Sequence, residues 1–175
     1  MAQITMAGVE VDSVEAATSI TEAVVVGEIV AIAAHPDADK LRVCEVNAGI
    51  ATSIQVVCGA PNARAGMKGV FAPVGTWVPG IEVELKAAKI RGVESSGMLV
   101  SEREMGLSDD HEGIVELPEE TAIGAPAAEI MGLSDPAIEI GMTPNRQDCA
   151  GIRGIARDLD AAALGTPTPL EAPEH

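Results

Sequence analysis

Short stretches of alternating or continuous apolar residues, separated by glycine and proline, make up most of this chain. In residues 8–16 apolar and polar side chains alternate, which is typical of a strand with one face in solvent. Residues 24–32 form a denser apolar run and predict a central strand. Further strands are predicted at residues 41–48, 53–58, 69–74, 85–90, 97–100, 113–117 and 137–142. Many short strands with such breaks predict a mainly β fold, either a small barrel or a sandwich.

Helical segments are few in this pattern. Ser101 can cap a turn that ends at Gly106, with Glu104 as its capping-box partner. A helical turn before the last strand favours a Greek-key barrel such as the OB-fold. Residues 125–131 predict a short helix, and a longer one is predicted to begin at Asn145 and to end before Gly165. The buried stripe of that last helix should hold Ile152, Ile155, Ala156, Leu159 and Ala163.

The composition predicts an aliphatic core. The chain has 175 residues, of which 47% are hydrophobic, so it can bury a core and does not have the composition of a disordered chain. Phe71 and Trp77 are the only aromatic residues. Proteins that bind single-stranded nucleic acid usually stack bases on several aromatic rings. With only two aromatic rings, the chain can stack few bases, and the sequence leaves open whether both rings lie in the core.

The charge is strongly negative and unevenly distributed. The formal net charge is −16 at pH 7, which argues against a simple binder of polyanions. Residues 1–34 carry −5, residues 35–103 carry +1, and residues 104–175 carry −12. Eight of the eleven Lys and Arg residues lie in the middle segment. A modest local basic face is therefore possible there.

The cysteines and the apolar runs indicate in which part of the cell the protein is expected. Cys44, Cys58 and Cys149 are too few and too scattered for a metal site or a disulfide framework. An odd number of cysteines without a secretory leader fits a reducing cytosol, so we expect a cytoplasmic protein. No apolar run reaches the roughly 18–20 residues of a membrane helix, so no membrane association is expected.

Four motifs in a fixed order indicate a family. They are His35–Val43 (HPDADKLRV), Val57–Asn62 (VCGAPN), Lys86–Ser101 (KAAKIRGVESSGMLVS) and Met142–Asp148 (MTPNRQD). Together they resemble the amino-terminal part of the β subunit of bacterial phenylalanyl-tRNA synthetases, over residues 6–164. The middle motifs are shared with a wider group of tRNA-binding modules, similar to endothelial-monocyte-activating polypeptide II. Thr143–Arg146 narrows the resemblance to the β subunit.

The resemblance implies a particular domain organisation. A five-stranded OB-fold barrel, residues 23–132, would be inserted in a small, incomplete α/β subdomain made of residues 1–22 and 133–165. Residues 166–175 would form an extended tail. We therefore expect residues 9–16 and 137–142 to lie side by side outside the barrel, covered by the last helix. The family's β subunits carry a further helix ahead of Ile4, so the chain is expected to be a fragment of a longer subunit with some exposed apolar surface.

The resemblance also implies an activity for the parent protein. Such ligases join phenylalanine to its tRNA with ATP and Mg²⁺, as an α₂β₂ assembly of the α subunit and the whole β subunit. No nucleophile, base or metal constellation is recognisable here, so this fragment is expected to be non-catalytic and to hold no cofactor. It would contact tRNA by shape and charge, and no DNA is expected as a partner. A structural or protein-interaction domain with slight tRNA contact is the alternative.

The candidate site residues are cations that could contact tRNA phosphates: Lys86, Lys89, Arg91, Lys40, Arg42, Arg64 and Lys68. On a regular strand Lys86 would lie on one face and Lys89 with Arg91 on the other, so the three share a face only with a bulge or bend. Lys40 and Arg42 share a strand face and would extend the basic surface. Arg64 and Lys68 are either loop charges or a rim of that surface. All seven could also be solubilising charges.

The remaining polar motifs have simpler explanations. His35, Asp37 and Asp39 lack the spacing of a Mg²⁺ or Zn²⁺ site, and we expect one of these aspartates to accept turn N–H groups. Gly97 is expected to permit a close approach of neighbouring strands. His111 follows two aspartates and should be a hydrogen-bonded surface residue. Arg146 should pair with a carboxylate rather than with RNA.

Overall fold

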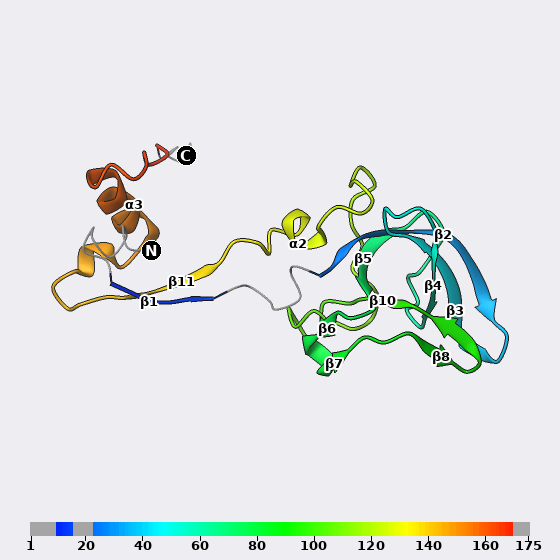
Figure 1. The fold of residues 1–175 in the computed structure, drawn as a ribbon. Coiled ribbons are helices and arrows are strands. Elements are labelled where there is room, and N and C mark those ends of the chain that lie inside the picture. Colours follow the sequence, from blue (N-terminus) through cyan, green and yellow to red (C-terminus); the bar gives the residue numbers. More distant parts are fainter. Residues whose placement is uncertain (1–9, 16–22, 170–175) are drawn as a thin grey trace, which may run out of the picture. The chain divides into compact units, whose positions relative to one another are not determined.

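The protein divides into two compact units in this computed structural model, which describes residues 10–15 and 23–169 (Figure 1). One unit lies within Ala16–Asp135 and is called the barrel unit below. The other combines Met1–Glu15 with Pro136–His175 and is called the flanking unit. Among the described residues, none of the helices is long and apolar enough to cross a membrane. The finer domain limits at residues 22 and 132 stay predictions.

A five-stranded antiparallel sheet forms the barrel unit. Its strand order is β10-β5-β2-β3-β4. Register irregularities within β2 bend that long strand across the barrel. The two edges of the sheet meet where the Ser96 N–H, just before β10, donates to the carbonyl of Gln55 in β4 at 2.9 Å. This nearly closed barrel confirms the expected OB-like fold. The strands are β2 (Val25–His35), β3 (Ala38–Asn47), β4 (Ile54–Cys58), β5 (Lys68–Pro73) and β10 (Gly97–Leu99).

Aliphatic side chains fill the barrel, as the composition predicts. Val26, Ile29, Val46 and Val70 are fully buried; Ile29 and Val46 belong to one core cluster, and Val26 and Val70 to a second. Phe71 is the largest of the fully buried side chains. The expected close approach at Gly97 is confirmed, because a Cβ there would lie 2.5 Å from the Phe71 ring.

The predicted capping box is also confirmed. The Ser101 N–H donates to the Glu104 carboxylate at 2.5 Å, and the Glu104 N–H lies 3.4 Å from the Ser101 hydroxyl oxygen. The turn ends at Gly106, whose φ of +72° is readily accessible to glycine. The shared hydrogen bonds fix the exit of the chain from β10.

Two of the predicted strands differ from the observed structure. Residues 85–90 are a strand only over β8 (Ala88–Ile90), which pairs with β9 (Val93–Ser95), while residues 85–87 link it to a separate hairpin. That hairpin consists of β6 (Trp77–Val78) and β7 (Val83–Glu84), joined through the 3-10 turn η1 (Pro79–Ile81). Each of its strands is two residues long, too short for an alternating pattern to reveal.

The predicted strand at residues 113–117 is not formed either. The side-chain amide of Asn62 takes both backbone groups of Ile114: its Oδ1 accepts the N–H at 3.0 Å, and its Nδ2 donates to the carbonyl at 2.9 Å. The Val115 N–H donates to the Val100 carbonyl at 3.0 Å and the Leu117 N–H to the Lys68 carbonyl at 2.9 Å, with one isolated bridge between Gly69 and Glu116. The Asn62 side chain thus takes the place of a neighbouring strand at Ile114 only.

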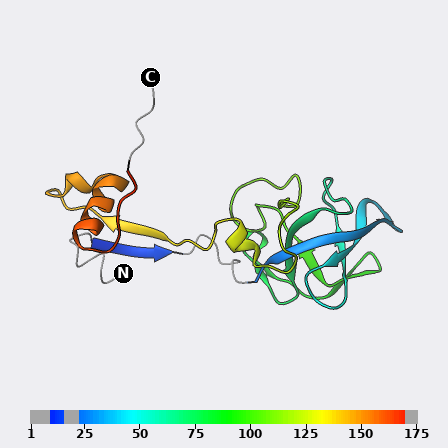
Figure 2. The same cartoon turned by 90° about the horizontal axis from the view of Figure 1, so that it is seen from above.

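The flanking unit contains the expected strand pair. β1 (Glu10–Glu15) pairs antiparallel with β11 (Ala137–Gly141), which confirms that these distant segments lie side by side. Positions 9 and 16 of the predicted first strand are outside the described residues. The helix α3 (Ile152–Ala161) lies by the end of this ribbon that holds Gly141 (Figure 2). In the barrel unit, α2 (Ala127–Ile130) falls within the short helix predicted at residues 125–131.

The start and the end of the last helix were predicted wrongly. The chain forms a 3-10 turn, η2 (Gln147–Cys149), and α3 begins only after Gly151, which is extended and makes no side-chain cap. A Cβ on Gly154 would lie 1.9 Å from the Asp148 carbonyl oxygen, so η2 packs directly on α3 and the two cannot form one continuous helix. The helix is capped at Ala162 instead of Gly165, and Ile152 is 87% exposed rather than buried.

Candidate nucleic-acid interface

The tip of the β8–β9 hairpin is fastened to the turn between β2 and β3. His35 is buried there, and its Nδ1 accepts the N–H of Asp37 at 3.1 Å. Because Nδ1 is the acceptor, Nε2 carries the proton and donates to the Ile90 carbonyl at 3.0 Å. The histidine therefore accepts the turn N–H that we had expected Asp37 or Asp39 to accept. It joins two segments 55 residues apart.

This fastening sets the position of Arg91. Arg91 has a φ of +46° and Gly92 a φ of +87°, so together they form the tight turn of the hairpin. Arg91 Nη1 donates to the Asp37 carbonyl at 3.3 Å, which brings it to the segment that leads into Lys40. Neither Lys86 nor Arg91 lies within a strand, so strand alternation does not separate these cations.

Lys40, Arg42 and Lys86 are exposed. Among the described residues none of the three takes part in an ion pair with a carboxylate. Along β3, Arg42 shares a face with Cys44 and Val46, whose side chains are buried in the barrel, whereas Lys40 lies where the register with β2 shifts. Arg42 thus continues the inward face of β3 beyond the core. The charges of Lys40 and Arg42 remain available to a bound anion.

Lys89 is only loosely paired. Its Nζ lies 3.5 Å from the Glu94 carboxylate across the β8–β9 hairpin, and both side chains are about 70% exposed. Exposed pairs of this kind contribute about 0–1 kcal/mol. A phosphate can therefore compete with Glu94 for this ammonium group.

Arg64 and Lys68 belong to a different environment. The Arg64 guanidinium forms an ion pair with Glu116, which raises the pKa of Arg64 and lowers that of Glu116. Lys68 Nζ donates to the carbonyls of Glu119 and Thr121 at 2.5 and 2.6 Å. These two cations tie β5 and the loop before it to the segment after Ile114. Of the seven predicted residues, Arg64 and Lys68 are thus engaged within the fold, and the other five remain available to a ligand.

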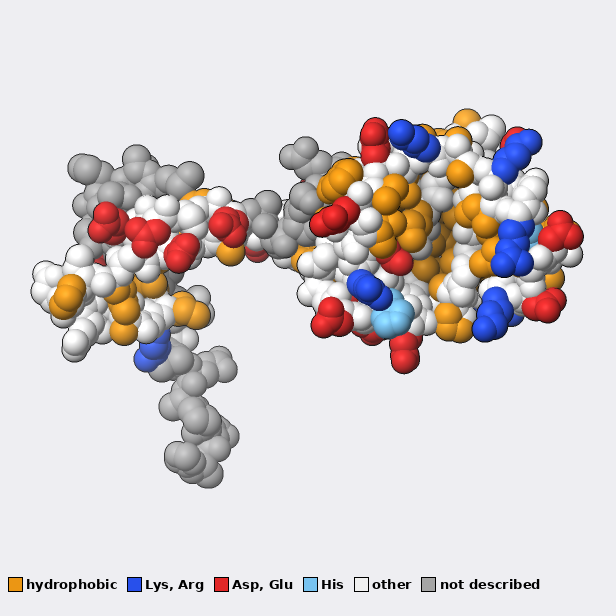
Figure 3. Space-filling view, turned by 90° about the horizontal axis from the view of Figure 1, so that it is seen from below, with side chains coloured by type: hydrophobic (Ala, Val, Ile, Leu, Met, Phe, Trp, Pro, Cys, Tyr) orange, Lys and Arg blue, Asp and Glu red, His pale blue; other side chains and the backbone are white. Residues whose placement is uncertain are grey.

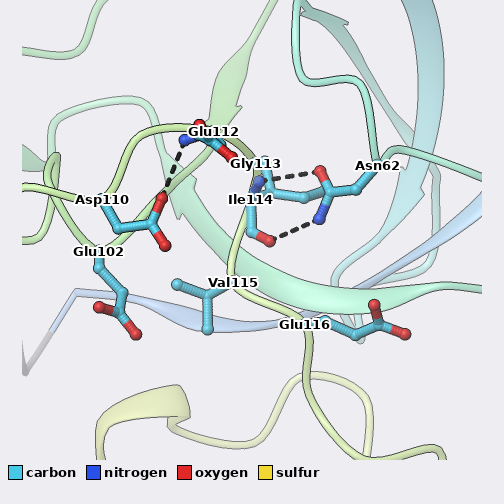
Figure 4. Close-up of a pocket in the computed structure, with 8 residues that line it drawn as sticks. All are labelled: Asn62, Glu102, Asp110, Glu112, Gly113, Ile114, Val115 and Glu116. Carbon is cyan, nitrogen blue, oxygen red and sulfur yellow. Dashed lines mark hydrogen bonds between the residues drawn. The ribbon is translucent and has the colours of Figure 1, made fainter.

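The surface of the barrel unit carries both cations and an acidic pocket. Figure 3 shows Lys and Arg side chains following one another along one side of a hollow with hydrophobic side chains. The same unit has a pocket of about 390 Å³ that is lined by four carboxylates (Figure 4). Its walls include Glu102, Asp110, Glu112 and Glu116, with Asp110 accepting the Glu112 N–H at 3.0 Å. Such a pocket repels phosphates.

Comparison with known proteins identifies the barrel. Residues 24–126 match a family model described as "Putative tRNA binding domain". The chain belongs to this tRNA-binding domain family. The matched residues contain the whole five-stranded barrel and all seven cations predicted for the site.

Relatives extend the similarity of this tRNA-binding domain beyond the barrel. The chain is 54% identical over 164 residues to the phenylalanine–tRNA ligase beta subunit of Brucella abortus, covering 94% of this chain and 20% of that protein. It is 50% identical over 172 residues to the same subunit of Bartonella henselae, covering 98% and 21%. These matches confirm the resemblance to the β subunit. The chain spans about a fifth of the length of these relatives.

Solved structures also resemble the tRNA-binding domain. A MetRS-related protein from Pyrococcus horikoshii matches with 26% identity and a TM-score of 0.43, over 59% of this chain and 86% of that one. The C-terminal domain of Plasmodium vivax p43 matches with 21% identity and a TM-score of 0.43, over 61% and 60%.

Two cysteines of the tRNA-binding domain meet inside the barrel, which their sequence spacing did not suggest. Cys44 on β3 and Cys58 on β4 are both buried and reduced. The Cys44 thiol donates to the Cys58 sulfur, which lowers the pKa of Cys58 to about 7 and raises that of Cys44. The Ala60 N–H also donates to Cys58 Sγ at 3.4 Å. These contacts hold the end of β4 against β3.

Arg146, in the motif outside the matched residues, pairs with carboxylates as predicted. Its guanidinium contacts Asp148 at 3.2 Å and also binds Asp158 of α3. Asp148, Cys149 and Asp158 place their ligand atoms within 4.8 Å of one another, but Arg146 and Arg157 supply the positive charge there. The cluster therefore fastens η2 to α3. His111 is likewise the surface residue that we expected, with Nδ1 3.1 Å from the Asp109 carbonyl.

Replacing Arg146 with Met should raise the pKa of both Asp148 and Asp158. The hydrogen bond from Arg146 lowers the pKa of Asp148, and those from Cys149 and Arg146 lower the pKa of Asp158. A lowered folded-state pKa stabilises the flanking unit above the unfolded value of about 3.9, and this stabilisation disappears as pH falls through the folded value. Carboxyl ¹³C NMR titration measures both groups. Arg153→Met, on α3, is the control, and equal titration curves in both variants would contradict the prediction.

Proposed function

We propose that this chain is a tRNA-binding module that contacts the phosphate backbone through Lys40, Arg42, Lys86, Lys89 and Arg91. The match of residues 24–126 to the tRNA-binding family carries this proposal. The location of the five cations supports it, because they are exposed and four of them have no carboxylate partner among the described residues. Backbone contact by such charges recognises shape and gives little sequence discrimination.

The relatives suggest the larger protein to which this module belongs. In our proposal, the chain is part of the β subunit of a cytoplasmic phenylalanine–tRNA ligase, which joins phenylalanine to tRNA with ATP and Mg²⁺. Its partners are tRNA, the α subunit and the rest of the β subunit, in an α₂β₂ assembly. Within that enzyme, the role of these residues is contact with tRNA rather than catalysis. The similarity to β subunits over 94–98% of the chain supports this setting.

Binding of tRNA should be weak and steeply dependent on salt. Five cations act against a formal charge of −16, so a Kd of about 10⁻⁴–10⁻⁶ M is expected at physiological salt. With two to five phosphate contacts, the slope of log affinity against log salt should be about −2 to −4. Fluorescence anisotropy of labelled tRNA at several salt concentrations measures both values.

Variants that each neutralise one cation distinguish a phosphate contact from an effect of overall charge. Arg42→Gln should flatten the salt slope by about 0.7–0.9, because it removes one phosphate contact. Arg64→Gln changes the net charge equally, but Arg64 is already paired with Glu116, so its effect should be smaller. If the two variants behave alike, only overall charge matters. If tRNA does not bind at low salt, the chain is a structural or protein-interaction domain.

A further inference from the structure

The two aromatic residues have opposite environments. Phe71 is 1% exposed and lies in the barrel core, whereas Trp77 is 50% exposed on β6. Its two chain neighbours show why: Thr76 and Val78 are buried, so Trp77 between them turns outward. The only tryptophan of the chain therefore presents part of its ring to solvent.

Lys86 shares the outward face with Trp77. Trp77 pairs with Glu84 across the β6–β7 hairpin. The pairing extends past β7, because the Leu85 N–H donates to the Thr76 carbonyl at 2.8 Å, and the Gly75 N–H donates to the Leu85 carbonyl at 2.8 Å. Leu85 packs against the core, and its chain neighbours Glu84 and Lys86 are both exposed. Diagonal cross-strand neighbours are within reach of aromatic and long side chains, so Trp77 and Lys86 can act on one ligand.

We propose that Trp77 stacks on an unpaired base of tRNA while Lys86 contacts a phosphate of the same strand. The proposal rests on the proposed function, and it adds a recognition element that backbone charge alone lacks. Aromatic rings bind every type of base through its π face, and unpaired bases of RNA are the ones available for stacking. The exposed ring and the exposed ammonium group provide one partner for a base and one for a phosphate.

Two carboxylates belong to the same hairpin as Trp77. Glu84 lies directly opposite Trp77 and repels a phosphate there, and Glu82 lies just before β7. Ile81 and Val83 of the same hairpin are also exposed. Exposed apolar side chains alone would also suit a protein partner. The exposed cation at Lys86 favours a nucleic acid strand, and the docking of a protein is an outcome of the test.

Because Trp77 is the only tryptophan and the chain has no tyrosine, its fluorescence reports on this site alone. We expect tRNA to quench that fluorescence with the same Kd as anisotropy gives. Trp77→Leu should weaken tRNA binding by about fivefold to a hundredfold, because base–aromatic stacking is lost while apolar character is kept. Trp77→Phe should retain most of the affinity. Glu84→Gln, which removes the opposing charge, should strengthen binding.

Two further measurements separate the possible failures. A fully paired RNA duplex should bind without quenching, because it offers no unpaired base. If tRNA binds with the predicted salt slope but Trp77→Leu binds equally well, stacking is refuted and the patch serves a protein partner. If tRNA does not bind the unaltered chain at low salt, the proposed function itself fails. Circular dichroism of each variant checks that the barrel is intact.

Discussion

Replacing Lys86, Lys89 and Arg91 with Glu should weaken tRNA binding at least about a hundredfold at low salt. Each exposed charge contact contributes up to about 1 kcal/mol, and the reversal replaces three attractions with repulsions. The three residues follow one another along one segment, and its tip is fastened to the barrel through His35 and Asp37. The loss should be similar for different tRNAs, because phosphate contacts carry no sequence information. Anisotropy titrations at low and moderate salt measure it.

A second set of variants controls for net charge. Neutralising Lys86, Lys89 and Arg91 to Gln changes the charge by the same amount as neutralising Arg64, Arg103 and Arg153. The first set should flatten the salt slope by about two to three, and the second by less than about one. Equal slopes would show that the cations of the β8–β9 region have no special role. Intact tRNA binding in the charge-reversed protein would show that these three cations do not carry the contact with tRNA.

The barrel was predictable because most of its strands are long enough to alternate. Residues 24–32, 41–48, 53–58 and 69–74 all lie largely within observed strands. The errors have local causes that periodicity does not contain. Asn62 takes the backbone groups of Ile114 through its side chain, and Gly154 admits η2 against α3. In each case a contact between distant or irregular segments overrides the local pattern.

The candidate site was predictable in residue type but not in arrangement. A basic segment can be read from the sequence, but Arg64 is paired with Glu116 and Lys68 donates to backbone carbonyls, both about 50 residues further along the chain. The position of Arg91 likewise depends on a distant segment, through His35 and Asp37. Trp77 and Phe71 both lie among apolar neighbours, and only the register of β6 against β7 decides that Trp77 faces outward. Long-range contacts therefore determine which residues are available.

Gly97→Ala should destabilise the barrel unit by about 3–5 kcal/mol. Gly97 has a φ of +143°, and a Cβ there would lie 2.5 and 2.6 Å from two atoms of the Phe71 ring and 2.9 Å from the Ala72 carbonyl oxygen. The strained backbone costs about 1–3 kcal/mol and the overlap with the core a similar amount. Because a small domain is stable by only about 5–15 kcal/mol, the variant should be close to unfolding. Urea denaturation followed by Trp77 fluorescence measures the change.

Gly66→Ala separates the two contributions. Gly66 has a φ of +81°, but a Cβ there would meet nothing within 4 Å, so this variant carries the backbone strain alone and should cost about 1 kcal/mol. The overlap can then be relieved from the other side, because Phe71→Leu removes the ring atoms that the added Cβ at position 97 would strike. In the Gly97→Ala background, Phe71→Leu should cost less than in the native background, a coupling of about 1–2 kcal/mol. Additive effects in this double-mutant cycle would show that Gly97 is required by its backbone conformation and not by the packing of Phe71.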